Sequence, residues 1–467
     1  MSDSRNIVTG FFLISAAALS VAAYVVYPKA VSTGMEEQVN KPLFEFEPKS
    51  VRGLSIVKYD QDRNTFDEIV MENSLVNGWQ IPSKFDYPVD SAEKLVYTAS
   101  SLSGLIVLAI ASEDPTDEET YGVVEPAAGL KAGQEGVGVK VSLKDRSKQE
   151  IASVIIGKEV KDQPNNRFVR IPGQRFIYIC EYDPSILKTD FFSWINPKVL
   201  NWSGQWTVSK LAIDNYSSTK SPILEVKQSY QAGLALEQNQ WTTLSFVDAE
   251  NKDAKPNLNV AELERIRLAL ENFEIQDVVR KSPGLAKSLK ERTGIPVTFA
   301  VMSNIEKLGF FVDEKSKKEL GAGGALSFTS NVGIRYRMLF GALLTASVTG
   351  KPNDQRCVMV SADVDESKFP MPVNPDDAKK QGGEKKNDPP KPNGMGCEPG
   401  DLQDDDDERE ARRQYQIKLE ERNEKIAEAK KVADQINNRF ANWFYIIDNK
   451  LYQALMPPKA EIVTSNR

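Results

Sequence analysis

The sequence predicts an α+β protein in which an N-terminal transmembrane helix precedes two related strand-rich α+β repeats and a C-terminal charged helix. Three observations lead to this prediction. One long segment near the N-terminus carries no charge, strand and helix patterns recur in the same order in two stretches, and a charged segment near the C-terminus has a seven-residue apolar repeat. The length of 467 residues favours two or three domains.

The uncharged segment runs from Ile7 to Tyr27, about the ~20 residues that a helix needs to cross a bilayer. A cleavable signal peptide has a shorter apolar core and a small-residue cleavage site. This segment instead ends in Tyr24, Tyr27 and Pro28, which is typical of an interfacial aromatic belt and a helix stop. We therefore expect an uncleaved membrane anchor over residues 1–28.

The charges that flank this segment are nearly balanced, with Arg5 on one side and Lys29 and Lys41 on the other. An excess of Lys and Arg normally marks the cytoplasmic flank, so these charges do not decide the orientation. The short N-terminal tail favours a cytoplasmic N-terminus and a body that faces the periplasm or the cell exterior.

The first repeat is expected over residues 43–200. Alternating and β-branched residues predict strands at 51–57 and 66–71, and Asn77-Gly78 predicts a turn into a third strand at Trp79. Asp90 and Glu93 resemble a capping box at the start of a helix. The apolar stripe of this helix is Leu95, Ala99, Leu102 and Ile106, and further strands are expected at 138–143, 152–156 and 167–171.

The second repeat is expected over residues 205–365. Leu211-Ala212-Ile213 matches the first strand, Trp241 matches Trp79, and a helix follows Asn259. Two unrelated α+β domains are the alternative. The helical stripe is Leu263, Ile266, Leu270 and Phe273, and strands are expected at 309–312, 325–329 and 333–340.

Residues 366–407 are rich in Pro, Gly, Lys and Asp, which predicts a disordered linker or an exposed insertion. Residues 408–467 begin with a charged helix that extends to about Phe440. Three heptads are the lower limit for a coiled coil, so the helix is expected to pack either on its own body or on a partner. Its narrow apolar seam is Leu419, Ile426, Ala429, Ala433, Ile436, Phe440 and Trp443.

Composition excludes several classes of function. The chain has no histidine, which removes the commonest general base and zinc ligand. A net charge of −7 with scattered Lys and Arg argues against nucleic-acid binding. Cys180 lies in an apolar run and is expected to be a buried thiol, whereas Cys357 and Cys397 bracket the polar linker and form a disulfide only in an oxidising compartment.

Four short motifs resemble functional sites, and each favours a structural interpretation. Ser91-Ala92-Glu93-Lys94 has the spacing of Ser-x-x-Lys acyl-transfer enzymes without their companion motifs, and Ser91 suits a helix start. The run of aspartates from Asp404 to Asp407 lacks the other ligands of a calcium loop and suits the position before a helix.

Glycines 133, 136 and 138 do not follow a strand and open a helix, so they do not predict a nucleotide-binding loop. Trp79 and Trp241 are expected to be core anchors of the two repeats rather than walls of a binding cleft. The sequence thus predicts no catalytic, cofactor-binding or metal-ligating residue.

Several of these segments together resemble the bacterial domain-of-unknown-function family numbered 4340, most clearly over residues 43–200. The later segments are similar to long members of that family from planctomycete-type bacteria. The segments that carry the resemblance are Leu43-Phe44-Glu45-Phe46, Leu54-Ser55-Ile56, Trp79-Gln80-Ile81, Tyr121-Gly122-Val123, Ile155-Ile156-Gly157-Lys158, Gly309-Phe310-Phe311-Val312, Gly333-Ile334-Arg335-Tyr336 and Arg439-Phe440-Ala441-Asn442-Trp443.

The resemblance implies an accessory role beside membrane transporters of the ABC class and supplies no catalytic residue. The expected protein is a non-enzymatic scaffold or binding module, held in the bacterial inner membrane by a single pass through Ile7 to Tyr27, with a protein partner. Two alternatives remain. One is a carboxylate-based hydrolase or carbohydrate-active enzyme, which needs no histidine. The other is a structural subunit that assembles through the C-terminal helix.

Overall fold

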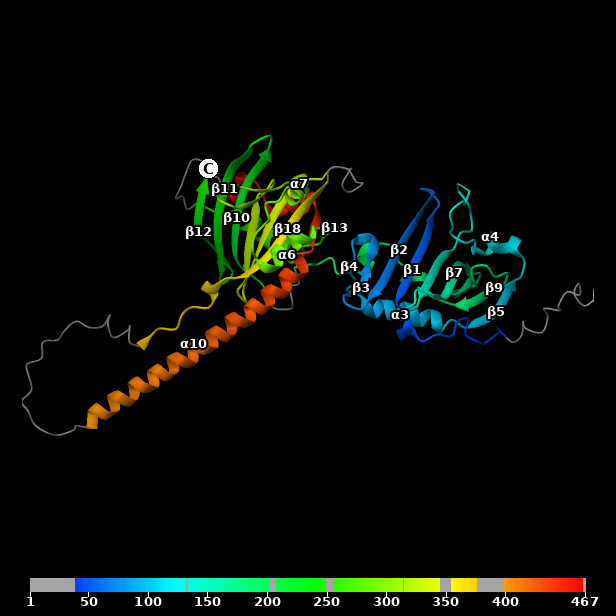
Figure 1. Cartoon of the computed structure of the whole chain (residues 1–467), viewed down its shortest axis with the longest axis horizontal. Helices are drawn as coiled ribbons and strands as arrows, with labels where there is room; N and C mark the ends of the chain where they lie inside the picture. Colours follow the sequence, from blue (N-terminus) through cyan, green and yellow to red (C-terminus); the bar gives the residue numbers. More distant parts are fainter. Residues whose placement is uncertain are drawn as a thin grey trace, which may run out of the picture. The chain divides into compact units, whose positions relative to one another are not determined.

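The computed structural model describes residues 38–131, 133–200, 207–248, 256–313, 315–344, 354–375 and 399–464. The chain divides into two compact units after Asn196. Each unit contains one large sheet with accompanying helices, which confirms the predicted α+β class (Figure 1). No helix within the described ranges is long and apolar enough to cross a membrane. The predicted anchor, Ile7 to Tyr27, lies outside those ranges.

The first unit contains a nine-stranded sheet in the order β4-β3-β2-β1-β6-β7-β8-β9-β5. All neighbouring strands are antiparallel. The strands are β1 (Gly53–Asp60), β2 (Thr65–Ser74), β3 (Gly78–Ile81), β4 (Tyr87–Pro88), β5 (Val107–Ser112), β6 (Val139–Lys144), β7 (Glu150–Val160), β8 (Gln163–Arg170) and β9 (Ile177–Glu181). The helices are α3 (Ala92–Ser103) and α4 (Glu118–Tyr121).

The predicted periodicities place the core of this unit correctly, except at the two ends of helix α3. Alternation on β1 buries Leu54 and Ile56, and the helical stripe buries Leu95 on α3. The helix begins after Ser91 rather than at a capping box on Asp90, whose Oδ2 instead accepts a hydrogen bond from the backbone N–H of Asn196 at 3.0 Å. Ile106 lies beyond the helix and is 46% exposed, so the predicted stripe is one residue too long.

The second unit contains an eight-stranded antiparallel sheet and a separate two-stranded one. The strands of the large sheet are β12 (Gln240–Asp248), β11 (Leu224–Glu237), β10 (Val208–Lys220), β16 (Ala325–Ser330), β17 (Ile334–Leu343), β18 (Gln355–Val364), β19 (Trp443–Asp448) and β13 (Asp277–Arg280), in this order across the sheet. The small sheet pairs β14 (Phe310–Val312) with β15 (Glu319–Gly321). The helices are α5 (Val260–Glu271), α6 (Pro283–Glu291), α7 (Phe299–Lys307), α10 (Pro399–Phe440), α11 (Asn449–Leu455) and α12 (Lys459–Ile462).

The two large sheets have the same order of strands along the chain. Eight strands of the first sheet correspond one to one with the eight strands of the second, and only the two-residue β4 is left over. In the order across each sheet, the corresponding strands are β3-β2-β1-β6-β7-β8-β9-β5 and β12-β11-β10-β16-β17-β18-β19-β13. In each unit the helix α3 or α5 precedes the last strand of this order. Leu54 and Leu211 are both buried at matching positions of β1 and β10.

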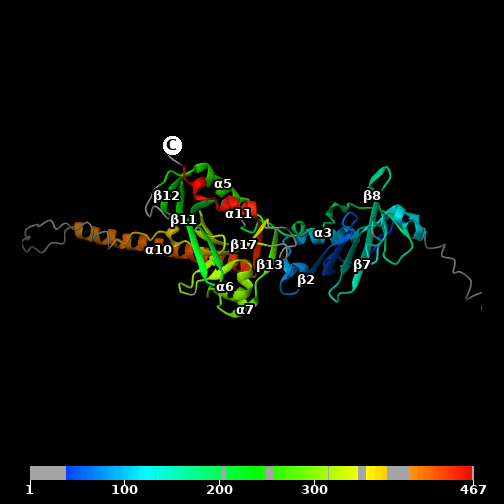
Figure 2. The same cartoon turned by 90° about the horizontal axis from the view of Figure 1, so that it is seen from above.

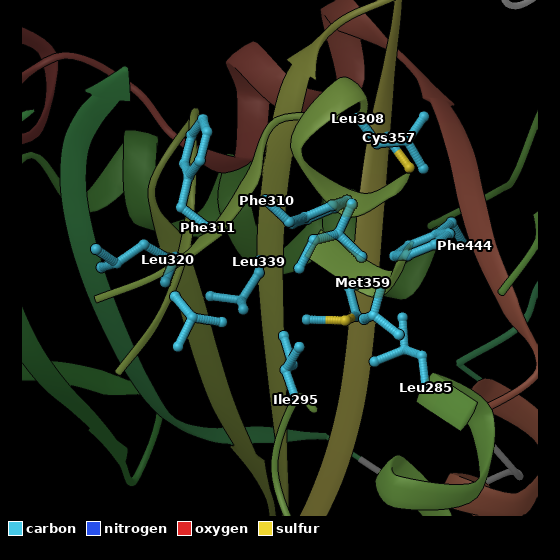
Figure 3. Packing of buried hydrophobic residues seen from close by; sticks show 14 of the residues in the cluster. Leu285, Ile295, Leu308, Phe310, Phe311, Leu320, Leu339, Cys357, Met359 and Phe444 are labelled. Atoms are coloured by element: carbon cyan, nitrogen blue, oxygen red, sulfur yellow. The ribbon is translucent and has the colours of Figure 1, made fainter. Parts of the chain in front are cut away.

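Helices cover both faces of the second sheet. On one face, α6, α7 and the β14–β15 hairpin enclose a core in which Phe310 and Phe444 stack with ring centroids 5.3 Å apart (Figure 3). On the other face, α11 lies beside α5 (Figure 2). There Tyr452 packs edge-on against Phe340 of β17. Leu339 of β17 faces the core beneath α6 and α7, whereas Phe340 faces α11 on the opposite side of the sheet. The side chains of β17 therefore alternate between the two cores.

Three expectations for the second half differ from the structure. Residues 310–312 form a hairpin apart from the large sheet, because β16, β17 and β18 take the places of β6, β7 and β8. Trp443 belongs to the strand β19 and not to the helical seam. The charged helix begins at Pro399, so it includes the end of the predicted linker, and residues 376–398 lie outside the described ranges.

Candidate functional site

The Ser-x-x-Lys motif is held in structural contacts. Ser91 is the residue before α3, and its hydroxyl makes no capping hydrogen bond. Lys94 Nζ donates to the backbone carbonyl of Ser193 at 2.9 Å and lies 4.6 Å from the centre of the Trp194 ring. Burial lowers the pKa of Lys94, and Asp190 opposes that shift. The ammonium group therefore ties α3 to the segment that closes the first unit.

Trp79 and Trp241 are not core anchors, so that expectation is wrong. Both are only half-buried, because β3 and β12 lie near or at the edge of their sheets. Trp241 Nε1 donates to Glu264 Oε1 on α5 at 2.8 Å. Each tryptophan thus occupies the same place in its own sheet, as the sequence pattern indicated.

The glycine and aspartate motifs also have local explanations. Gly133 and Gly136 have positive φ angles of 72° and 69°, and a Cβ at Gly136 would overlap the backbone of Glu119. These glycines therefore shape a turn between α4 and β6. The run from Asp404 to Asp407 lies inside α10, so its predicted position before a helix is wrong.

The two described cysteines are buried free thiols. Burial raises the pKa of Cys180 on β9 to about 12, as expected for an inert core thiol. Cys357 lies at the centre of the second unit's core on β18 rather than at the start of a linker. Cys397, the cysteine with which it could pair only in an oxidising compartment, lies outside the described residues.

The long helix α10 offers the most distinctive candidate interaction surface. Its C-terminal half buries one stripe against the second sheet, and buried residues recur there at intervals of three and four. Ion pairs at the rim join Arg292 to Asp434 at 2.7 Å and Lys430 to Glu366 at 3.5 Å. The residues of this buried stripe are Ile426, Ala429, Ala433, Asn437 and Phe440.

Asn437 joins α10 to the backbone of β18. Its Nδ2 donates to the Ala362 carbonyl at 2.7 Å, and its Oδ1 accepts from the Ala362 N–H at 2.8 Å. Strand β19 pairs only with residues 355–358 of β18, so β18 has an open edge at Ala362. The amide side chain satisfies both backbone groups there and covers an edge that would otherwise invite pairing.

Lys281 fixes the C-terminal end of α10. Its fully buried Nζ donates to the carbonyl of Phe440, the last residue of the helix, at 2.8 Å and lies 4.9 Å from the centre of the Phe444 ring. Burial lowers the pKa of Lys281 to about 7, and Cys357 and Glu319 oppose that shift. A cation at this position also complements the negative end of the helix dipole.

The described N-terminal part of α10 has a different environment. From residue 409 to residue 425 no side chain is buried, although the stripe continues through the half-buried Tyr415, Leu419 and Arg422. Arg422 Nε still donates to the Phe369 carbonyl at 2.8 Å. Beyond this point the helix extends away from the sheet (Figure 1). Ile417 is 39% exposed on this extension.

Two cavities of the second unit are lined by pairs of carboxylates, the groups that a glycoside hydrolase would need. One cavity of ≈ 210 Å³ includes Glu319 and Asp363, which pair with Arg337 and Arg335 respectively. Another, of ≈ 440 Å³, includes Glu306 and Asp313. Glu306 pairs with Lys220 at 2.7 Å, and hydrogen bonds from Ser316 and Lys315 lower the pKa of Asp313. These carboxylates are engaged in structural roles, and the hydrolase alternative stays a prediction.

Comparison with known proteins finds one family match. Residues 79–291 match a domain of unknown function, DUF4340. This confirms the family resemblance, although the matched region begins later than expected and continues into the second unit as far as α6. No curated protein and no solved structure matches the chain.

Proposed function

Because residues 79–291 match the model of the DUF4340 family, we propose that the chain is a non-enzymatic, membrane-anchored accessory or scaffold protein of the bacterial cell envelope. In this proposal the segment Ile7 to Tyr27 holds the chain in the inner membrane, and the body faces the periplasm or cell exterior. The N-terminal half of α10 binds a protein partner in a membrane complex, and the family resemblance implies a complex of the ABC transporter class.

One observation carries the proposal. The stripe that packs α10 on its own sheet continues for about two further turns without a buried residue, through Leu419 and Tyr415. A helical extension of this length gains little from helix propensity alone, so it usually needs charge pairs or a packing partner. Half-buried apolar groups on a projecting helix suit the helix-in-groove mode of recognition.

We also propose that the two units are related halves of a tandem repeat. Support comes from the identical order of strands, the helix at the same point of each unit, and matching buried residues such as Ile56 and Ile213. In a repeat, two equivalent scaffolds differ chiefly in their loops, where binding sites usually lie. The insertion of α10 in one half then marks that half as the binding half.

A pull-down from native membranes in mild detergent tests the partner hypothesis. We expect the wild-type chain to recover at least one other protein, and Tyr415→Glu combined with Leu419→Glu to reduce that recovery about tenfold, because hot-spot residues dominate such interfaces. Gln416→Glu combined with Lys418→Glu is the matched control, since both residues are exposed on the same turns.

Recovery of only this chain, or equal recovery by both double variants, would contradict the proposal. If an untagged second copy is the sole protein recovered and the Tyr415 and Leu419 variant loses it, the chain is instead a subunit that assembles through α10. Unchanged thermal unfolding of both variants is the required control for folding.

A further inference from the structure

The second unit has a polar cavity of ≈ 480 Å³ on the side of the sheet where α11 lies. This volume falls within the range of small-molecule sites. Its walls come from β10, β11, β18, α11 and the turn between β15 and β16, segments that are far apart in the sequence. The polar side chains that line it include Lys227, Gln228, Arg356 and Tyr452, and the backbone at Gly323 lies beside them.

Two β-bulges shape this cavity. The pairing of β10 with β11 shifts between Asn215 and Tyr216, which leaves Ser229 as an extra residue in the cavity wall. The pairing of β17 with β18 shifts between Phe340 and Leu343, just where Arg356 lies on the opposite strand. Bulges redirect side chains and are common beside binding sites.

Arg356 is held rigidly at the wall of the cavity. Its guanidinium carbon lies 3.9 Å from the centre of the Tyr452 ring. Nη1 donates to the Gly341 carbonyl at 2.5 Å, and Tyr452 Oη donates to the Gly323 carbonyl at 3.0 Å. A Cβ at Gly323 would lie only 2.6 Å from Nη1, so glycine permits the close approach of the backbone. The plane of the guanidinium is therefore fixed before any ligand arrives.

The cavity is electropositive. Its lining residues include Arg356 and Lys227 and no carboxylate, and neither cation forms an ion pair with any residue in the described ranges. Burial lowers the pKa of Arg356, but an arginine stays protonated in proteins. Asp214, which does not line the cavity, accepts a hydrogen bond from Gln228 and pairs with Lys318. A partly desolvated cation without a counterion favours the binding of an anion.

We propose that this cavity binds a small carboxylate-bearing molecule, with Arg356 as the planar fork and Lys227 as a second cation at the rim. A fixed guanidinium matches the planar geometry of a carboxylate. Phosphate sites instead commonly use several backbone N–H groups at a helix N-terminus. In this cavity the positive groups are the side chains of Arg356 and Lys227 rather than backbone N–H groups. This difference favours a carboxylate over a phosphate.

Calorimetric titration of the full-length chain in mild detergent tests this assignment, with succinate as the probe. We expect saturable binding of succinate and no binding of succinamide, which has a similar shape without charge. Arg356→Met should weaken succinate binding by about tenfold or more, because a hydrogen bond to a charged group contributes about 1.5–3 kcal/mol. Lys227→Met should weaken it by roughly threefold, because this rim charge is more exposed.

Arg335→Met is the matched control, because Arg335 lies on the neighbouring strand outside the cavity and pairs with Asp363. It should bind succinate like the wild type. Absence of succinate binding, equal binding of succinamide, or tighter binding of inorganic phosphate would overturn the proposal. If Arg356→Met does not fold, Lys227→Met tests the proposal instead, because Lys227 is exposed. Wild-type affinity for succinate in the Lys227→Met variant would also overturn the proposal.

Discussion

The two units differ most in one connection between neighbouring strands. These strands occupy equivalent places in the two sheets. In the first unit a turn at residues 171–176 connects β8 to β9, whereas in the second unit residues 365–442 connect β18 to β19 and include α10. A second difference lies between β13 and β16, where α6, α7 and the β14–β15 hairpin replace the shorter α4 segment. Both insertions occur in connections, which tolerate added residues far better than the strands do.

The insertion also changes how the sheet is completed. Five residues of β8 pair with β9, from Asn166 to Arg170. On the longer β18, only residues 355–358 pair with β19, and α10 covers the open edge at Ala362 through Asn437. In the second unit a helix thus covers the part of the strand edge that β19 leaves open, and the remaining length of the helix projects from the sheet.

The largest expected effect tests whether the two sheets are equivalent. Ile56→Ala and Ile213→Ala remove matching buried side chains, each at most 1% exposed, from β1 and β10. Each should destabilise its own unit by about 2–5 kcal/mol. Urea unfolding followed by hydrogen exchange in each unit measures this. A large loss from one variant and almost none from the other would break the equivalence.

The next effect concerns the buried Lys281 at the end of α10, a feature of the second unit. The pKa of Lys281 is about 7 in the folded state, which lies below its value in the unfolded chain. At a pH between these two pKa values the unfolded chain binds more protons than the folded one. The free energy of unfolding therefore rises with pH across that range. We expect a gain of about 2 kcal/mol from about pH 7 to about pH 9.

Lys281→Met should remove this rise, whereas Lys287→Met, at an exposed position on α6, should keep it. Urea unfolding of both variants across the same pH interval provides the measurement. A wild-type chain whose stability does not change over that interval would show that Lys281 remains protonated in the folded state.

A smaller effect is expected at the edge that α10 covers. Asn437→Ala leaves the N–H and carbonyl of Ala362 without their partners and should cost about 1–3 kcal/mol. Asn438→Ala, at the exposed neighbouring position, should change stability by less than about 0.5 kcal/mol. Hydrogen exchange at the Ala362 amide should accelerate in the first variant alone; equal protection in both would contradict the covering role of Asn437.

The smallest effect is expected at the rim of α10. Arg292→Ala breaks the ion pair with Asp434, whose side chain is 61% exposed, and exposed pairs contribute about 0–1 kcal/mol. We therefore expect a change of unfolding free energy within that range that shrinks further in high salt. A loss of several kcal/mol would mean that rim charges, rather than the apolar stripe, hold the helix to the sheet.

Local patterns were sufficient to predict much of the fold. The alternation around Leu54 and Leu211 located β1 and β10, and the stripes starting at Leu95 and Leu263 located α3 and α5. Strand β19 was missed because Trp443 also fits the heptad of the preceding helix. Strand β11 was missed because residues 225–229 are exposed and, apart from Val226, polar.

The candidate sites were harder to predict because their partners are distant in the sequence. Asn437 lies 75 positions from Ala362, and Arg356 lies 93 positions from Asn449, whose side chain it reaches at 3.5 Å. Nothing in the residues next to Arg356 indicates Tyr452 or the bulges around it. The sequence around Arg356 carries no signal of a site, and Asp354, two positions earlier, even suggests a local ion pair.

Site-specific photo-crosslinking in native membranes tests the central claim, that the projecting half of α10 binds a partner protein, most directly. A photoreactive residue at Leu419, on the half-buried stripe, is compared with one at Lys418, which is exposed. We predict a crosslinked product with another protein from position 419 and little or none from position 418. No product from position 419, or equal products from both positions, would contradict the account.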